Sequence, residues 1–280
     1  MTTIHSRYVS VDGIKTHYLE GGDGPTVVLW HSGEFGGAAE LSWEFLAPAL
    51  AKHFHVVAPD WLGFGRTDKV YDFAGGRNRV MNHMARFLQV MSIDKADFVG
   101  NSMGGSNLAR IACMQQSDFP IRSIVLCSGG GFAPDNDSRR VLLNYDCSEG
   151  AMKALLNAMF HTTKLADDAA YVKRRQDIAL IPGAWECTAA ARFKSPAVPA
   201  RAEFGAADTN VYENIAVPTL IVAGAHDKLR EPGYAPAMAK RIKDCELHVF
   251  EDCGHCPNLE FPERFNEVTL RFLKRVNGIA

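Results

Sequence analysis

Gly100-Asn101-Ser102-Met103-Gly104-Gly105 lies between a predicted strand and a predicted helix. The preceding Lys95-Ala96-Asp97-Phe98-Val99 is a short apolar run bounded by charge, which is typical of a buried strand. Residues 106–114 place their apolar side chains at helical spacing. A Gly-x-Ser-x-Gly in this setting forms a turn so tight that glycines must flank the serine, whose hydroxyl stands clear of the backbone. We therefore predict that Ser102 is a nucleophile, rather than a serine that only caps the helix.

The C-terminal third of the chain supplies a candidate acid and a candidate base for this serine. A serine hydroxyl needs a base to become nucleophilic, and the base needs its own orienting group. Residues 219–224 form a continuous apolar run, as in a parallel strand covered on both faces, and Asp227 comes just past its end. Residues 246–250 alternate like another strand, and His255 follows them. We predict a catalytic triad of Ser102, His255 and Asp227. Poorer candidates for the acid, because neither directly follows an apolar run, are Asp208 and Asp252.

An oxyanion hole is the third requirement of acyl transfer, and it needs backbone N–H groups aimed at the developing charge. One donor should be the N–H of Met103, the residue after the nucleophile. The other should lie in a loop after an early strand, and residues 31–37 follow the apolar run 26–30. This loop opens with a histidine and carries three glycines. We assign the second donor to Gly33.

The order of strand and helix signals predicts an α/β fold with a mostly parallel sheet. The chain begins with a hairpin signal, in which two alternating segments flank Asp12-Gly13, a pair suited to a type I′ turn. Strand-like and helix-like segments then alternate. The predicted strands cover 26–30, 55–59, 96–100 and 121–127, and the predicted helices cover about 41–52, 78–91 and 103–116.

The alternation stops at Ser128-Gly129-Gly130-Gly131 and resumes near Val217-Pro218. Helix-like stretches without a convincing strand fill the interval, at residues 150–160, 167–180 and 184–193. We predict that 132–210 form a helical cap over the carboxyl ends of the strands, where α/β sheets place their sites. The core domain would then consist of residues 1–131 and 211–280.

Residues 60–68, Asp-Trp-Leu-Gly-Phe-Gly-Arg-Thr-Asp, and residues 254–265 carry a resemblance to a known superfamily. Residues 60–68 resemble the loop after that family's next strand, and residues 254–265 resemble its histidine segment running into the last helix. Together with the serine turn, the oxyanion loop and the order of the triad, they make the chain similar to the α/β-hydrolases over nearly its whole length. The resemblance implies the α/β-hydrolase fold, a sheet flanked by helices with an inserted cap.

Within that superfamily, Gly-Asn-Ser-Met-Gly-Gly resembles the meta-cleavage-product hydrolases, which cut C–C bonds in dienol keto acids. The resemblance implies C–C cleavage in such an acid or a related ketone, after ketonisation, with attack by serine or by activated water. A carboxylesterase or lactonase acting on a small aromatic or polyketide-like ester needs the same triad and stays an alternative. A ligand-binding protein on this fold is disfavoured, because all three triad positions hold competent residues.

Several residues depart from the subgroup or are candidates for substrate contact. Glu34 and Phe35 intrude into a loop that the subgroup usually keeps glycine-rich, and Cys256 stands where a tryptophan often follows the histidine. Glu34 can point to solvent, pair with a cap arginine, or face the pocket with a raised pKa. The resemblance also implies a cap arginine that grips a substrate carboxylate, near Arg174 and Arg175. Further candidates for substrate contact, each with a purely structural alternative, are Asn101 beside the nucleophile and Trp185 in the cap.

The composition predicts an enzyme of the cytoplasm with a small-molecule substrate. The chain has 280 residues, and its 30 Lys and Arg against 32 Asp and Glu argue against a nucleic-acid or membrane partner. The first residues lack an apolar signal segment, and seven cysteines, an odd number, fit a reducing compartment. Cys253-Gly254-His255-Cys256 lacks the second ligand pair of a zinc site, so we expect no metal and no cofactor. The sequence is also compatible with a homo-oligomer.

Overall fold

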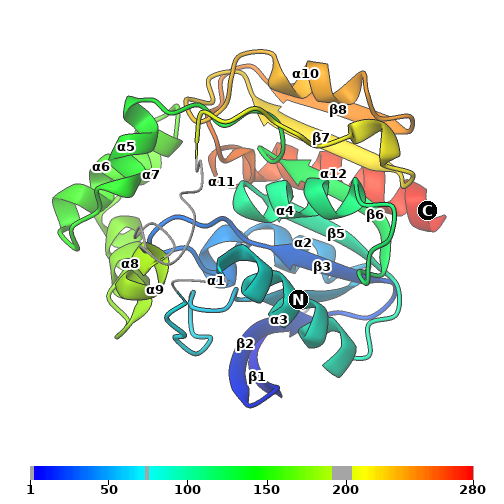
Figure 1. Cartoon of the computed structure of the whole chain (residues 1–280), viewed down its shortest axis with the longest axis horizontal. Coiled ribbons are helices and arrows are strands. Elements are labelled where there is room, and N and C mark those ends of the chain that lie inside the picture. The colour runs from blue at the N-terminus through cyan, green and yellow to red at the C-terminus, as the bar shows by residue number, and fades with distance from the viewer. Residues whose placement is uncertain (1–2, 73–75, 191–203, 280) are drawn as a thin grey trace.

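A computed structural model describes residues 3–72, 76–190 and 204–279, and an eight-stranded sheet forms its centre (Figure 1). The order of the strands across the sheet is β1-β2-β4-β3-β5-β6-β7-β8. The first two strands run antiparallel to their neighbours, and all the other pairs are parallel. The strands are β1 (His5–Val11), β2 (Ile14–Gly21), β3 (Thr26–Trp30), β4 (His55–Pro59), β5 (Ala96–Asn101), β6 (Ile121–Cys127), β7 (Thr219–Gly224) and β8 (Cys245–Phe250). This is the predicted α/β-hydrolase fold.

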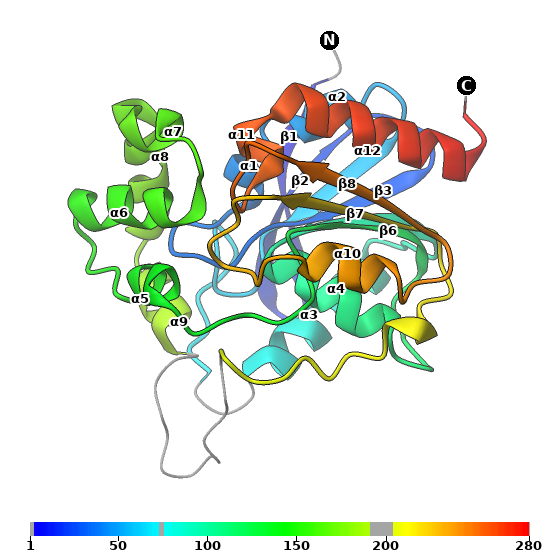
Figure 2. The same cartoon turned by 90° about the horizontal axis from the view of Figure 1, so that it is seen from above.

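Helices cover both faces of the sheet, so that its parallel strands are buried on two sides (Figure 2). One face is covered by α1 (Ala39–Ser42), α2 (Leu46–Leu50) and α12 (Pro262–Asn277). The other is covered by α3 (Gly76–Val90), α4 (Met103–Ala112) and α10 (Tyr234–Ala239). Two short elements complete the core, the helix α11 (Pro257–Glu260) and the 3₁₀ turn η1 (Tyr212–Asn214). Among the described residues no helix has the length and apolarity needed to cross a membrane.

A helical insertion separates β6 from β7 and lies beside the sheet (Figure 1). It consists of α5 (Asp137–Leu143), α6 (Glu149–Met159), α7 (Lys164–Asp167), α8 (Ala169–Ala179) and α9 (Ala184–Ala190). Its apolar side chains share one cluster with Leu229, Cys256 and Leu259, which follow β7 and β8. The insertion therefore packs on the loops at the carboxyl ends of the strands.

Some predicted helices are shorter in the structure than in the sequence analysis. The helix expected over 41–52 is broken into α1 and α2, because Pro48 lacks an N–H and its ring would clash with the carbonyl of Glu44 in a continuous helix. The helix expected over 103–116 ends at Ala112. The helix expected over 184–193 is present as α9 to Ala190, and its remaining residues lie outside the described ranges. The hairpin has the predicted turn, with positive φ at both Asp12 and Gly13.

Helix α4 approaches the sheet so closely that a side chain at Gly104 has no room. A Cβ atom built there would lie 2.1 Å from the carbonyl oxygen of Trp30 in β3. Gly150 occupies the corresponding second position of α6, yet a Cβ there would meet nothing closer than 4.0 Å. These glycines form a matched pair that differs in packing and not in place along the helix.

We expect Gly104→Ala to lower the free energy of unfolding by at least about 2 kcal/mol, because backbone atoms must move to admit the methyl group. Gly150→Ala should leave stability unchanged or raise it by up to about 1 kcal/mol, since alanine is the better helix former. Urea unfolding followed by circular dichroism measures both. Equal, small effects of the two substitutions would contradict the close approach of α4.

Candidate active site

The structure brings Ser102, His255 and Asp227 together, although they follow three different strands, β5, β8 and β7. The Nε2 atom of His255 lies 2.7 Å from the Oγ atom of Ser102, and its Nδ1 atom lies 2.7 Å from Oδ2 of Asp227. The side chains of His255 and Asp227 are 1% and 2% exposed. When Nδ1 carries the proton and donates a hydrogen bond to the carboxylate, Nε2 is free to accept the proton of the serine hydroxyl.

Ser102 occupies a strained turn at the start of α4. Its φ of 52° and ψ of −108° lie outside the regions that L-residues favour. The Ser102 N–H donates to the Cys127 carbonyl in β6 at 2.8 Å, and the Ser102 carbonyl accepts from the N–H of Ser106 at 2.8 Å. A Cβ at Gly100 would lie 2.5 Å from the carbonyl carbon of Gly104. These contacts hold the serine at the helix N-terminus and explain the surrounding glycines.

Asp227 is held as a buried carboxylate. Burial alone would raise its pKa, but the neighbouring His255 and the positive charge of Arg230 outweigh burial and lower it. One carboxylate oxygen also accepts from the N–H of Leu229 at 2.8 Å. The alternative acids lie elsewhere: Asp208 accepts a hydrogen bond from the hydroxyl of Tyr212 at 2.6 Å, and Asp252 is exposed.

The loop that carries Gly33 lies directly beside the start of α4. A Cβ at Gly33 would lie 2.5 Å from the sulfur of Met103, so the two candidate oxyanion donors belong to adjoining segments. The base of the loop is fixed by His31, whose Nε2 accepts from the N–H of Trp61 at 3.1 Å. Because Met103 is the first residue of α4, its N–H has no partner within the helix and is available to an anion.

The arginines expected to contact substrate have different surroundings. Arg174 is half exposed and pairs with Glu44 at 2.8 Å on the surface, as in the purely structural alternative for this residue. Arg175 is fully buried and forms an ion pair with Glu34, which is 5% exposed. Of the arrangements open to Glu34, the structure has the ion pair with a cap arginine.

The other candidates for substrate contact line the insertion or the core. The ring of Phe35 lies 4.9 Å from that of Tyr145 and stacks at 6.3 Å on that of Trp185, whose Nε1 donates to the Tyr145 carbonyl. Asn101 is fully buried, and its Nδ2 donates to the Cys127 carbonyl at 3.3 Å. Its Oδ1 atom has no partner among the described residues.

The sequence analysis missed two charged residues beside the triad. Glu260 accepts hydrogen bonds from the N–H groups of Gly254 at 2.9 Å and His161 at 2.8 Å, which ties the histidine loop to the end of α6. Arg230 donates from Nε to the Ser128 carbonyl at 3.0 Å and from Nη2 to the hydroxyl of Ser106 at 2.9 Å. Their positions in the sequence could have indicated them, because each charged residue lies within five residues of a candidate triad member.

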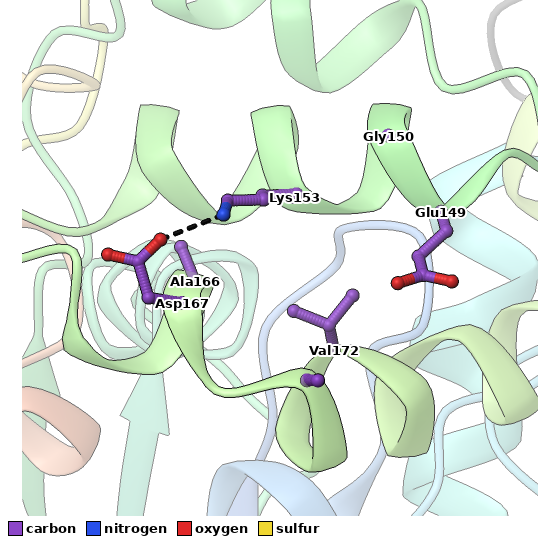
Figure 3. A pocket seen from close by; sticks show the side chains of 7 residues that line it. Glu149, Gly150, Lys153, Ala166, Asp167 and Val172 are labelled. Carbon is purple, nitrogen blue, oxygen red and sulfur yellow. Dashed lines mark ion pairs between the residues drawn. The ribbon is translucent and has the colours of Figure 1, made fainter.

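Neither the hollow within the insertion nor the two cysteines beside His255 belongs to the candidate triad. A hollow of about 190 Å³ between α6, α7 and α8 has a polar rim that includes the ion pair of Lys153 with Asp167 at 2.8 Å (Figure 3). No member of the triad lines it. Burial raises the pKa of the Cys253 and Cys256 thiols, which keeps both protonated and unreactive.

A family profile, related sequences and a related structure all indicate the same protein family for this chain. The profile of a family described as "Alpha/beta hydrolase family" matches residues 27–268. The 2-hydroxy-6-oxo-6-(2'-aminophenyl)hexa-2,4-dienoic acid hydrolase of Metapseudomonas resinovorans is 32% identical over 96% of this chain and 91% of its own. A 2-hydroxymuconate semialdehyde hydrolase of Pseudomonas sp. is 28% identical over 98% and 95%. The structure of a meta-cleavage product hydrolase from Pseudomonas fluorescens, 26% identical, superposes with a TM-score of 0.85 over 96% of this chain and 97% of that one.

We expect Ser102→Ala to lower kcat by at least about 10³-fold while the fold is kept, since the hydroxyl is the only group replaced. The same variant should lose covalent labelling by a fluorophosphonate probe, measured by mass spectrometry. Ser10→Ala, on an exposed strand position, serves as the control and should label fully. Labelling of Ser102→Ala at the wild-type level would show that another residue is the nucleophile.

Asp227→Asn should lower kcat by about 10⁴-fold, because an amide favours the wrong tautomer of His255. Asp208→Asn is the matched control, since that carboxylate bonds Tyr212 and no triad residue. It should keep activity and lose only about 1–2 kcal/mol of stability. Steady-state kinetics with any turned-over substrate compares the two variants. A larger loss of activity in Asp208→Asn would overturn the assignment of the acid.

Proposed function

The chain belongs to the alpha/beta hydrolase family, and we propose that it is a serine hydrolase in which Ser102 attacks a substrate carbonyl carbon. The observation that carries this proposal is the hydrogen-bonded series from Ser102 through His255 to Asp227, with 2.7 Å at each step. Such a series lets one residue act as nucleophile, the next as base, and the last as the group that orients the base.

The reaction can be followed through these side chains. The Ser102 proton passes to Nε2 of His255 as the oxygen bonds the carbonyl carbon, and Asp227 stabilises the imidazolium that results. The N–H groups of Gly33 and Met103 bind the oxygen that becomes negative. His255 then returns its proton to the leaving group, and a water molecule activated by the same histidine completes hydrolysis. Direct attack by activated water is the alternative route to the same products.

For the substrate, we propose a ketone of the meta-cleavage type, in which hydrolysis breaks a C–C bond. The relatives named for dienoic acid and muconate semialdehyde hydrolysis span nearly the whole chain and support this class. A carbon leaving group must be able to carry the electron pair of the broken bond. A dienol gains this ability by ketonising first, which requires a proton transfer that His255 is placed to assist.

Hydrolysis of a carboxylic ester or lactone is the second candidate. It is favoured by the ion pair of Arg175 with Glu34, which leaves no uncompensated cation at this position for the carboxylate of a keto acid. The same nucleophile and oxyanion donors serve both reactions, and an alkoxide leaves more readily than a carbanion. The two candidates differ in the leaving group and not in the chemistry of Ser102.

Side-by-side kinetics with dienol ketones and aryl esters separates the candidates. We expect cleavage of a dienol ketone, measured as loss of its long-wavelength absorbance, with kcat/KM at least about tenfold above that for an aryl ester. Ser102→Ala is the control and should abolish both reactions. If only esters are hydrolysed, the serine hydrolase is supported and the C–C reaction is contradicted. If the enzyme hydrolyses neither class of substrate, the whole proposal is contradicted.

A further inference from the structure

Glu34 and Arg175 form a buried ion pair between the oxyanion loop and the insertion. Their side chains are 3% and 0% exposed. Burial alone would raise the pKa of Glu34, but the charge and hydrogen bond of Arg175 outweigh burial and lower it. Glu34 is therefore ionised at neutral pH, and the two charges cancel. An arginine that is satisfied by the chain's own carboxylate offers little attraction to another one.

This ion pair lies beside the candidate active site. Glu34 directly follows Gly33, whose Cβ position is 2.5 Å from Met103. Two residues further along the loop, a Cβ at Gly36 would lie 2.6 Å from the Arg175 carbonyl oxygen, so the loop runs against α8. Cys256, the neighbour of His255, is buried and experiences the charges of both Glu34 and Arg175. The pair thus adjoins the segments that carry the oxyanion donors and the base.

One nitrogen atom of the buried guanidinium has no hydrogen-bond partner among the described residues. Nη1 of Arg175 bonds Glu34, and Nε donates to the hydroxyl of Tyr171 at 3.3 Å. Nη2 is buried and has no partner among the described residues. A buried donor without a partner costs about 1–3 kcal/mol, which a ligand oxygen would recover. Tyr171 belongs to an apolar cluster that also holds the aromatic side chains of Phe35, Tyr145 and Trp185.

We propose that Glu34 determines substrate specificity, because it neutralises the positive charge of Arg175. The site then binds substrates that place an uncharged oxygen near Arg175 and disfavours substrates that place a carboxylate there. The inference rests on the proposed serine hydrolase and narrows its substrate to neutral ketones or esters. A carbonyl, ether or hydroxyl oxygen can accept from Nη2 without bringing a charge out of water. A carboxylate would lose its hydration and face Glu34, with no net positive charge to compensate it.

Hydrolysis of a matched ester pair tests the proposal, because release of 4-nitrophenolate requires Ser102 and not a C–C reaction. The acidic substrate is 4-nitrophenyl hydrogen glutarate, and the neutral one is its methyl ester. We expect wild-type kcat/KM to favour the neutral ester by at least about tenfold. Glu34→Gln keeps an oxygen toward Arg175 and removes the negative charge. It should shift the acid-to-neutral ratio toward the acid by at least about tenfold.

The neighbouring ion pair provides the control. Glu44→Gln removes the same charge beside Arg174 on the surface and should leave the ratio within about twofold of wild type. The double variant Glu34→Gln with Arg175→Met removes both buried charges, avoids an unpaired guanidinium and should return the ratio toward the wild-type value.

The outcomes separate this inference from the proposed function. An acid-to-neutral ratio that Glu34→Gln leaves within twofold of wild type would overturn the role of Glu34, whatever the enzyme cleaves. If the enzyme cleaves the esters with the predicted ratios but cleaves no dienol ketone, the proposed C–C reaction is contradicted, while the role of Glu34 is supported. If no ester is cleaved, binding is measured instead, as the change in melting temperature of the Ser102→Ala protein with monomethyl or dimethyl glutarate. Stronger stabilisation by the monomethyl acid when Glu34 is present would contradict the proposal.

Discussion

The close approach of α4 to the sheet is the constraint on which the rest of the site depends. Ser102 has a positive φ, and the turn persists because its N–H and carbonyl are both bonded, to β6 and to α4. The first turn of α4 then lies against the Trp30 carbonyl at the end of β3, where only a glycine fits. Because β3 leads directly into the loop of Gly33, the same contact sets Ser102 beside the candidate oxyanion donors.

A further set of contacts joins the insertion to the loops that carry His255 and Asp227. The N–H of His255 donates to the Met159 carbonyl at the end of α6 at 2.8 Å, and Glu260 bonds backbone N–H groups of both segments. The ammonium group of Lys228, next to Asp227, donates to the Asn157 carbonyl at 3.2 Å. The end of α6 is thus bonded to the loops of both candidate triad residues, so the insertion helps to hold these loops in place.

The sequence predicts the parts of this protein that local rules control. Buried strands, the glycine-flanked serine and the order of the triad residues are local patterns, and the structure has the expected strands in place. One predicted helix differs from the structure because apolar spacing was the only criterion: Pro48 interrupts a helix that this spacing alone would continue. The choice between Arg174 and Arg175 could have been made from the helix period. The apolar residues buried on α8 are Tyr171, Val172, Ile178 and Ala179. Arg175 lies at the centre of the face that they form, while Arg174 is turned away from this centre by about 100°. The partner of Arg175 could not have been found this way, because Glu34 lies 141 residues earlier in the chain.

The place of that ion pair argues for a role in the site and against a role in stability alone. A buried ion pair recovers little more than the cost of removing its charges from water, and apolar residues of similar size often serve a core as well. A lone Glu34 next to Gly33 would oppose the negative charge that an acyl-transfer site must stabilise. Arg175 cancels that opposition, and its Nη2 atom has no partner among the described residues. The buried pair is therefore polar but carries no net charge, and it adjoins the segments of the candidate oxyanion donors. This is the basis on which we propose an uncharged carbonyl compound rather than an acid as the substrate.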